Sequence, residues 1–404
     1  MPHLVVETVA ADDIGLLIPL LDPRDPLLFI RRGEGVAGVG EALRLEFSGA
    51  NRLADAAAAW RAIVADATVT DPIGLPGSGL IALGSFAFSA GSAATSVLIV
   101  PSVVIGRRGG RSWVTRINAP SAPIPIPTVL GHEYRIPLLP GAMTAEAFVA
   151  AVDSAIAAIR ADSARKVVLA RDLIGRLPEG ADLRRVLTYL ALGYPDSFTY
   201  AVNGLVGSSP ETLVRVDHGS VTARVLAGTT GRGTDAESDL QASVALATSA
   251  KDLDEHHYAI ASVMGALEPH TSQLSASEQP FTLKLPNLWH LASDVEGVLS
   301  DEATSLDLVG ALHPTAAVAG NPTSAALEII ARLEPFDRGR YAGPVGWVDA
   351  NGDGEWAVAL RCAHVSSTGR ITAYAGAGIV RGSVAAAELT ETKMKFRPIV
   401  EAFS

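Results

Sequence analysis

The chain has 404 residues, of which 32 are Lys or Arg and 43 are Asp or Glu, so its formal net charge is −11. This charge repels polyanions and argues against a general nucleic-acid-binding function. Hydrophobic residues make up 48% and charged residues 19%, which excludes a disordered chain. The single cysteine, Cys362, excludes a disulfide framework and a multi-cysteine metal site. A lone cysteine also suits a reducing compartment, and we expect a cytoplasmic protein.

Two apolar stretches raise the question of a membrane protein. The N-terminus begins Met1-Pro2-His3, without the basic residues of a signal peptide, and its first apolar run is short and contains Pro19. Residues 72–106 carry no charge and are long enough to span a bilayer. Glycines and prolines divide them into short apolar groups such as Leu80–Leu83 and Val97–Val100. The pattern therefore predicts buried strands joined by turns, and no membrane span.

The first part of the chain has mainly strand-like patterns, with one helix predicted over residues 51–65. It is followed by Ala119-Pro-Ser-Ala-Pro-Ile-Pro-Ile-Pro127, where alternating prolines favour an extended conformation and cannot enter a helix or a central strand. This segment is the best candidate boundary. We distinguish a strand-rich N-terminal part, residues 1–118, from residues 141–404, and expect residues 1–404 to form one unit.

Helix and strand signals alternate beyond the prolines. Thr144 has the residue type of a helix N-cap, and apolar residues recur at helical spacing from Phe148 to about Ala161. Helices are also predicted over residues 238–267, 323–333 and 388–403. Strands are predicted over residues 166–171, 198–202, 212–216, 221–226, 346–348, 356–362 and 371–375. Asp217-His218-Gly219 is expected to form the hairpin turn between two of these strands.

Two motifs match a known binding pattern only in part. Gly33-Glu-Gly-Val-Ala-Gly38 fits the dinucleotide fingerprint, but a short alternating segment follows it where the fingerprint requires a helix. We interpret it as a glycine-rich hairpin. Asp349-Ala-Asn-Gly-Asp-Gly354 begins like a calcium loop, but Leu360 occupies the twelfth position, where a bidentate Glu is needed. We interpret it as a turn between two strands.

Two predicted helices offer paired carboxylates. Asp252 and Glu255 are three residues apart and share a helix face, and Glu388 and Glu391 repeat that spacing. Lys395 adds a cation one turn further along the second face. Two such pairs could hold a hard divalent ion, and oxygen ligands with room for water suit Mg²⁺. The spacing alone, however, is more typical of a solvated charged helix face.

The surrounding sequence favours the metal site over a solvated helix face. From Lys166 onward, an ordered set of motifs resembles the chorismate-utilising enzymes, and most closely the isochorismate synthases. The motifs are Lys166-Val-Val-Leu-Ala-Arg171, Gly207-Ser-Ser-Pro-Glu-Thr-Leu-Val-Arg215, Leu226-Ala-Gly-Thr-Thr-Gly-Arg232, Lys251-Asp-Leu-Asp-Glu-His256, Leu312-His-Pro-Thr-Ala-Ala-Val-Ala-Gly320, Leu333-Glu-Pro-Phe-Asp-Arg338, Tyr341-Ala-Gly-Pro-Val-Gly-Trp347, Gly354-Glu-Trp356, Leu360-Arg-Cys-Ala363, Ala375-Gly-Ala-Gly-Ile-Val380 and Glu388-Leu-Thr-Glu391. Each motif is weak alone, but the ordered set is specific.

The resemblance implies a fold and a metal site. The fold is a single large α/β (α+β) unit with stacked antiparallel sheets and helices outside, with which the predicted elements are compatible. Glu255 and Glu391 would be Mg²⁺ ligands, and Asp252 and Glu388 would hold coordinated waters. The metal would orient the ring carboxylate of chorismate.

The resemblance also implies the substrate contacts. Arg361 and Tyr341 would bind the enolpyruvyl carboxylate, and Arg offers a fork that matches it. The backbone amides of Gly376 and Gly378 could approach a carboxylate closely because no Cβ intervenes. The other positions expected at the substrate site are Lys395, His313 and Ala317.

Isochorismate formation adds water at one ring carbon and expels hydroxide from another, so it needs a general base and a general acid. The resemblance places Lys166 as the base and Glu211 as the acid. Each needs a pKa moved toward neutrality, which burial would provide. On residues alone, Lys166 is typical of a strand-end surface lysine and Glu211 of a turn carboxylate.

Three positions separate the sister activities of the family. Anthranilate synthases, which use ammonia, typically have Gln in place of Lys166, and aminodeoxychorismate synthases often have a nucleophilic Lys in place of Ala227. Producers of salicylate, anthranilate and aminodeoxychorismate tend to have Thr in place of Ala317. Isochorismate synthases commonly have Leu in place of Val318. The first three favour an enzyme that stops at isochorismate, whereas Val318 departs from that pattern.

We therefore expect an isomerase that converts chorismate reversibly to isochorismate, with Mg²⁺ as its cofactor. A salicylate synthase and a non-catalytic chorismate-binding homologue are the alternatives, and a dinucleotide enzyme using Gly33–Gly38 is a more distant one. Chorismate is the expected partner. We expect no glutamine amidotransferase subunit, no nucleic acid and no membrane, and a monomer or weak homodimer. Menaquinone, siderophore and salicylate pathways all remain open.

Overall fold

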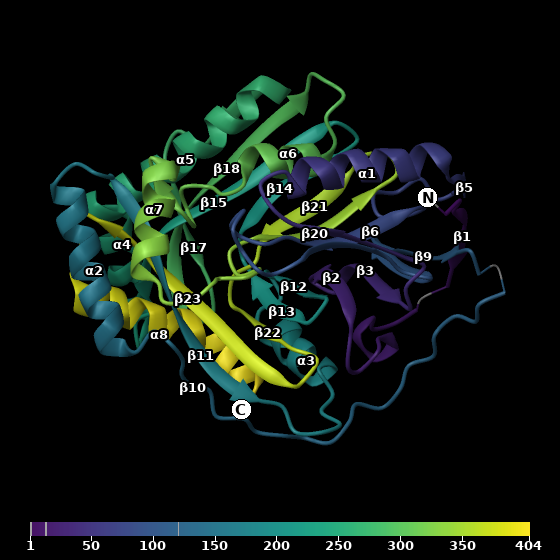
Figure 1. Ribbon diagram of the computed structural model, residues 1–404, viewed down its shortest axis with the longest axis horizontal. Helices are drawn as coiled ribbons and strands as arrows, with labels where there is room; N and C mark the ends of the chain where they lie inside the picture. Colours follow the sequence, from purple (N-terminus) through teal and green to yellow (C-terminus); the bar gives the residue numbers. More distant parts are fainter. Residues whose placement is uncertain (1, 13, 120) are drawn as a thin grey trace.

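The computed structural model describes residues 2–12, 14–119 and 121–404. Within these residues two large β-sheets are stacked on each other, and helices lie outside them (Figure 1). Neighbouring strands are antiparallel apart from β1 and β5, which pair in parallel. This arrangement agrees with the predicted fold class.

The larger sheet brings strands from both ends of the chain side by side. Its spatial order is β10 (Leu139–Pro140), β11 (Lys166–Arg176), β23 (Arg370–Val380), β22 (Cys362–Val365), β13 (Leu205–Ser209), β12 (Phe198–Val202), β2 (Leu27–Arg31), β3 (Glu34–Val39), β8 (Val103–Arg108), β9 (Arg111–Ile117), β1 (Val5–Ala11) and β5 (Thr68–Thr70), and β19 (Gly320–Asn321) pairs with β11.

The smaller sheet is ordered β16 (Thr271–Ala276), β18 (Leu288–Leu299), β15 (Ser220–Gly231), β14 (Thr212–Asp217), β21 (Gly354–Val358), β20 (Pro344–Asp349), β6 (Ile81–Ser85), β7 (Ser96–Val100) and β4 (Leu43–Phe47), and β17 (Phe281–Lys284) pairs with β18. The N-terminal part contributes to both sheets, because β2 pairs with β12 and β6 pairs with β20. The proline segment therefore separates two stretches of chain that share the same sheets.

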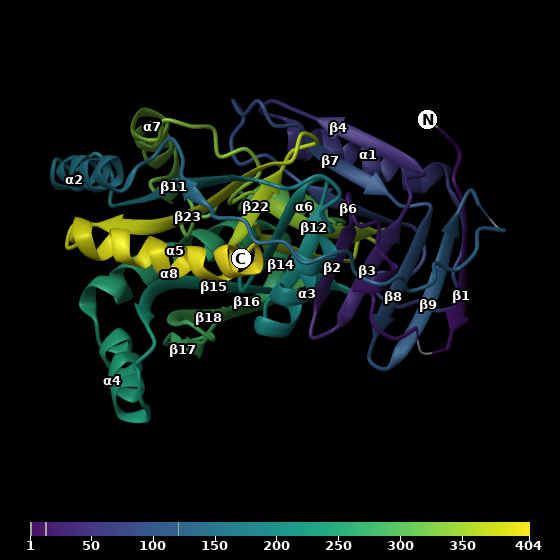
Figure 2. The same ribbon diagram turned by 90° about the horizontal axis from the view of Figure 1, so that it is seen from below.

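Helices cover the outer faces of the sheets. They are α1 (Arg52–Asp66), α2 (Ala145–Arg160), α3 (Arg184–Gly193), α4 (Ala236–Ala247), α5 (Ala250–Leu267), α6 (Ser305–Leu312), α7 (Thr323–Leu333) and α8 (Ala385–Ala402). Figure 2 shows α4 projecting away from both sheets on the side of β17 and β18. None of the helices in the described residues is long and apolar enough to cross a membrane.

Three apolar cores hold these layers together. The main core lies between the sheets, where Phe29 and Trp113 of the larger sheet join the same cluster as Trp347 and Trp356 of the smaller one. A second cluster packs α3 and α8 on the larger sheet, and a third packs α2 and α7 on β11 and β23. Strand β11 is thus covered by helices on one side, which leaves its other side for the candidate site.

Most predicted elements are present, and two predictions need correction. The helix expected over residues 238–267 is two helices, because Ser249 accepts a hydrogen bond from the Asp252 backbone and caps α5. The strand expected over residues 356–362 is interrupted between β21 and β22, where Arg361 has φ of +48°. Both breaks lie next to candidate site residues.

The glycine-rich and acidic motifs have structural roles. Residues 33–38 lie in the β2–β3 hairpin, which confirms the hairpin interpretation. The next element is strand β4, where a dinucleotide-binding motif requires a helix. Residues 349–354 form the turn between β20 and β21, where the Asp349 carboxylate accepts hydrogen bonds from the backbone of Asn351 and Asp353. The charge-free stretch forms β6, β7 and β8, as predicted.

The proline-rich segment is extended and lies along the outside of the molecule (Figure 1). Pro120, which belongs to the predicted segment, lies outside the described residues. The buried Arg184 guanidinium holds the following stretch by donating to the Thr128 hydroxyl and the Val129 carbonyl, and the Ile136 backbone donates to Phe403. The stretch that follows the prolines therefore runs against the end of α8.

The close approach of Gly106 to a buried ring gives a test of the core. A Cβ on Gly106 would lie 2.0 Å from the indole of Trp113, which is fully buried. We predict that Gly106→Ala lowers the free energy of unfolding by about 1–3 kcal/mol, measured by urea unfolding. Gly91→Ala is the control, because no atom lies within 4 Å of the added carbon. Equal unfolding curves for the two variants would contradict the packing.

Candidate active site

One cavity, lined by both sheets and by α5 and α8, gathers most of the residues that the sequence predicted as a site. Those that line it are Glu211, Glu255, Ala317, Tyr341, Arg361, Gly376, Gly378 and Lys395. The remaining predicted residues are Lys166, which lies next to this cavity, Asp252, Glu388 and Glu391, which lie on α5 and α8, and His313, which lies elsewhere.

Lys166 begins β11 and its side chain is fully buried. Its Nζ lies 3.2 Å from Glu255 Oε1 on α5, and it makes no hydrogen bond of normal geometry with any described residue. A Cβ on Gly378 would lie 2.1 Å from that Glu255 oxygen and 3.1 Å from Lys166 Cε. Glycine at this position of β23 is therefore what lets the carboxylate reach the lysine.

Glu211 follows Pro210 at the start of β14, and its side chain is buried. Its backbone nitrogen donates to Ser209 Oγ and its carbonyl accepts from Val358, which fixes the turn. Burial raises the pKa of Glu211 to about 7, although the positive charges of Lys166, Arg361 and Lys395 oppose that rise. The carboxyl can therefore hold or release a proton near neutral pH.

Arg361 is held by a histidine that sequence reasoning missed. Arg361 NH2 donates to Nε2 of His290 on β18 at 2.9 Å, and His290 Nδ1 lies 3.0 Å from Thr229 Oγ1. Burial, Arg361 and Lys395 keep the pKa of His290 well below its usual range, so its Nε2 is a neutral acceptor. His290 lies on β18, where no strand was predicted from the sequence, and it belongs to none of the family motifs.

The predicted substrate residues Tyr341, Gly376 and Lys395 also meet at this cavity. The Tyr341 ring stacks on Tyr374 with a centroid distance of 5.2 Å. A Cβ on Gly376 would lie 3.1 Å from the Tyr341 hydroxyl oxygen, and Lys395 Nζ donates to the Gly376 carbonyl at 3.0 Å. The glycines of β23 thus make room for side chains that approach from Tyr341 and from α5.

The acidic residues of α5 and α8 are paired with lysines. Glu388 lies 3.0 Å from Lys251, and Glu391 lies 2.5 Å from Lys395. Burial raises the pKa of Glu388 and the nearby Glu391 adds to that rise. Burial would also raise the pKa of Glu255, but its lysine neighbours outweigh burial and lower it.

These carboxylates fit a hard divalent cation in their chemistry. All are oxygen donors on two helices that the Lys251–Glu388 ion pair connects, and Asp252 is 3.9 Å from the same lysine. Among the described residues, however, no three His, Cys, Asp or Glu side chains are grouped closely enough to hold a metal ion. Glu255, Glu388 and Glu391 are paired with lysine ammonium groups instead. A bound metal ion would have to replace these lysines.

His313 is not brought to this cavity. Its Nε2 lies 2.8 Å from the Phe88 carbonyl, and the ring lines a separate cavity on the other side of the 313–318 loop. Burial lowers the pKa of His313 to about 4, so it is a neutral residue that fixes the loop. The structure therefore does not bring His313 together with the other predicted substrate residues, because its ring lies on the other side of the loop.

The comparisons agree with the geometry. Residues 137–404 match the family described as chorismate binding enzyme, and the chain belongs to that family. It is 39% identical to isochorismate synthase DhbC of Bacillus subtilis over 284 residues, which are 67% of this chain and 70% of that protein. It is 41% identical to the putative isochorismate synthase MenF of Mycobacterium tuberculosis over 250 residues, 59% of this chain and 67% of that one.

A solved structure resembles nearly the whole chain. It is the putative 2,3-dihydroxybenzoate-specific isochorismate synthase DhbC from Bacillus anthracis, with a TM-score of 0.80 and 30% identity. The likeness covers 96% of this chain and 98% of that one. It thus extends into the first 136 residues, which lie outside the family match.

The raised pKa of Glu211 predicts a pH-dependent stability. Between its ordinary value of 4.5 and about 7, the folded chain holds a proton that the unfolded chain releases. The free energy of unfolding therefore falls as pH rises through this range, by about 3 kcal/mol in total. Glu211→Gln has no charge to bury and should escape this loss.

The measurement is urea unfolding at pH 5 and pH 8. The free energy of unfolding of Glu211→Gln, relative to that of the wild type, should be larger at pH 8 than at pH 5. The exposed Glu278→Gln serves as the control and should follow the wild type at both pH values. Parallel pH dependences of the wild type and Glu211→Gln would contradict the raised pKa.

Proposed function

We propose that this protein is an isochorismate synthase, an isomerase that converts chorismate reversibly to isochorismate. Relatives of that name support the activity, at 39% and 41% identity. The observation that carries the proposal is the buried Glu211 carboxyl, titrating near pH 7 in the field of Lys166, at the cavity of a chorismate-binding chain. That pair supplies the acid and the base that the isomerisation needs.

Substrate binding uses the cations of the cavity. Chorismate carries two carboxylates, and burying them in an acidic protein requires local positive charge. Arg361, oriented by His290, presents a planar fork suited to the enolpyruvyl carboxylate, and the Tyr341 hydroxyl lies on the same lining. Lys395 adds positive charge from α8.

The chemistry is a proton transfer on each side of the ring. Lys166 removes a proton from the attacking water as its oxygen bonds to one ring carbon. The double bonds shift, and the hydroxyl on the other ring carbon leaves with a proton from Glu211. A carboxyl whose pKa is near 7 can give this proton and take it back in the reverse reaction. The two residues exchange roles when the direction reverses.

Mg²⁺ is the proposed cofactor, held by Glu255 and Glu391, with Asp252 and Glu388 binding its waters. When bound, it supplies charge that orients the ring carboxylate of the substrate. Lys166 and Lys395, which now pair with Glu255 and Glu391, would then be released from these ion pairs.

Ala317 bears on the product. It lines the cavity and offers no hydroxyl group, which favours release of isochorismate over pyruvate elimination. A salicylate synthase remains the alternative, and chromatography of the products from chorismate distinguishes the two. Accumulation of salicylate alone would contradict the proposed product.

Removing the acid or the base should abolish most turnover. We predict that Lys166→Ala and Glu211→Gln each lower kcat by roughly 10²–10⁴-fold, because each removes one proton transfer. Chorismate binding, measured by calorimetry, should persist in both. Lys393→Ala, an exposed lysine on α8, is the control and should keep wild-type turnover. Near-normal turnover in either site variant removes that residue from the mechanism.

Removing the metal should also abolish turnover. We predict no isochorismate in the presence of EDTA and recovery on addition of Mg²⁺. Glu255→Gln and Glu391→Gln should weaken Mg²⁺ binding measured by calorimetry, because each removes a charged ligand. Full turnover in metal-free buffer would exclude the two-helix metal site.

A further inference from the structure

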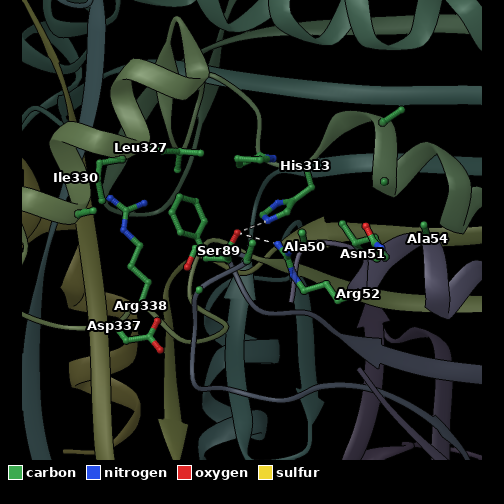
Figure 3. Close-up of a pocket in the computed structure, with 18 of the residues that line it drawn as sticks. Ala50, Asn51, Arg52, Ala54, Ser89, His313, Leu327, Ile330, Asp337 and Arg338 are labelled. Atoms are coloured by element: carbon green, nitrogen blue, oxygen red, sulfur yellow. Dashed lines mark hydrogen bonds between the residues drawn. The ribbon is translucent and has the colours of Figure 1, made fainter. Parts of the chain in front are cut away.

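A second cavity, of about 890 Å³, lies beside the candidate active site among α1, α6 and α7. The loop from His313 to Val318 separates the two, with His313 and Pro314 lining the second cavity and Ala317 and Val318 lining the first. Figure 3 shows two buried arginines at this second cavity, Arg338 and Arg52. The two arginines hold different parts of the protein.

Arg338 forms a buried fork with Glu334. Its Nε lies 2.8 Å from Glu334 Oε2 and its NH2 lies 2.6 Å from Oε1. The same guanidinium donates to the Val318 carbonyl at 2.9 Å and to the Val168 carbonyl at 2.7 Å. Val168 and Val318 both line the active-site cavity, so one rigid group connects two of its walls.

Glu334 and the chain after Arg338 extend this connection. Glu334 Oε1 also accepts the backbone N–H of Ala170 at 2.7 Å, two residues after Val168 on β11. The Tyr341 backbone N–H donates to the Arg338 carbonyl, and the Arg338 guanidinium lies 5.9 Å from the Tyr341 ring centroid. Neither Glu334 nor Arg338 lines the active-site cavity itself.

We infer that the Glu334–Arg338 pair is a positioning element that sets the separation between the β11 wall and the Val318–Tyr341 wall of the substrate cavity. The inference rests on the proposed function, and it assigns these two residues a role in chorismate affinity. Their effect is on binding because β11 is fixed independently by its continuous pairing with β23. Loss of the fork therefore displaces mainly Tyr341, because the Ala319 carbonyl next to Val318 still accepts the Val168 backbone N–H, and it leaves Lys166 in place.

Arg52 provides a matched control. It is a buried arginine at the same cavity, and it donates to three backbone carbonyls, those of Ala87, Gly49 and Phe88. None of these three groups lines the active-site cavity. Arg52→Met thus removes a buried guanidinium and its carbonyl contacts, none of which is made directly with a residue that lines the substrate site.

The experiment compares Arg338→Met, Arg338→Lys and Arg52→Met by thermal unfolding and by steady-state kinetics with chorismate and Mg²⁺. We expect Arg338→Met to raise KM about tenfold while kcat changes less than about threefold, because a shift of a binding wall weakens ground-state contacts. Arg338→Lys should recover part of the loss, since an ammonium can reach one carbonyl but cannot form the fork. Arg52→Met should lose thermal stability with an unchanged KM.

An unchanged KM in Arg338→Met, or an equal rise of KM in Arg52→Met, would overturn the inference. If Arg338→Met does not fold, Glu334→Gln is measured instead; a raised KM supports the inference and a wild-type KM overturns it. The proposed function is tested separately, by analysis of the product that the wild-type protein makes from chorismate. The comparison of arginine variants can be repeated with chorismate affinity from calorimetry, whatever that product is.

Discussion

The candidate site depends on a buried ion pair between a strand and a helix. Lys166 on β11 and Glu255 on α5 are charges of opposite sign that could not be buried separately without a large cost in free energy. Gly378 on the neighbouring strand leaves the space in which they meet. The pair therefore ties the position of α5, and the acids it carries, to β11 near one edge of the larger sheet.

Around that pair, acids and lysines alternate. Glu388 and Glu391 on α8 pair with Lys251 and Lys395. Glu211 lies in the field of Lys166 and Lys395, but among the described residues it forms an ion pair with neither. This difference separates two kinds of carboxyl group. The paired acids are suited to hold a cation, whereas the unpaired, buried Glu211 is suited to exchange a proton near neutral pH.

The sequence predicted much of the fold because its signals were local. The N-cap at Thr144, the hairpin turn at His218–Gly219 and the aromatic and β-branched residues of β12 are all signals of a few neighbouring residues. The breaks at Ser249 and Arg361 could not be predicted from periodicity, since apolar residues continue across both. The stacking of the sheets was implied by the family resemblance and depends on pairings between distant strands.

The site was predictable only in part. The family motifs identified eight residues that line the cavity. They also contained His313, which lies outside it, and Glu334 and Arg338, to which they gave no role, and they did not contain His290. His290, Glu334 and Arg338 act through another residue or through the backbone, and such contacts leave no pattern in a single sequence. The spacing of the acidic residues on α5 and α8 likewise indicated that they share a helix face. It did not indicate the lysine with which each acid forms an ion pair.

The central claim is that Lys166 and Glu211 together exchange a ring hydroxyl for a hydroxyl from solvent water. The most direct measurement is mass spectrometry of the product formed from chorismate in water labelled with heavy oxygen. The account predicts that each isochorismate molecule made in a single forward turnover carries one heavy oxygen atom. Isochorismate without the label would mean that the original hydroxyl migrates within the substrate, and would contradict the account.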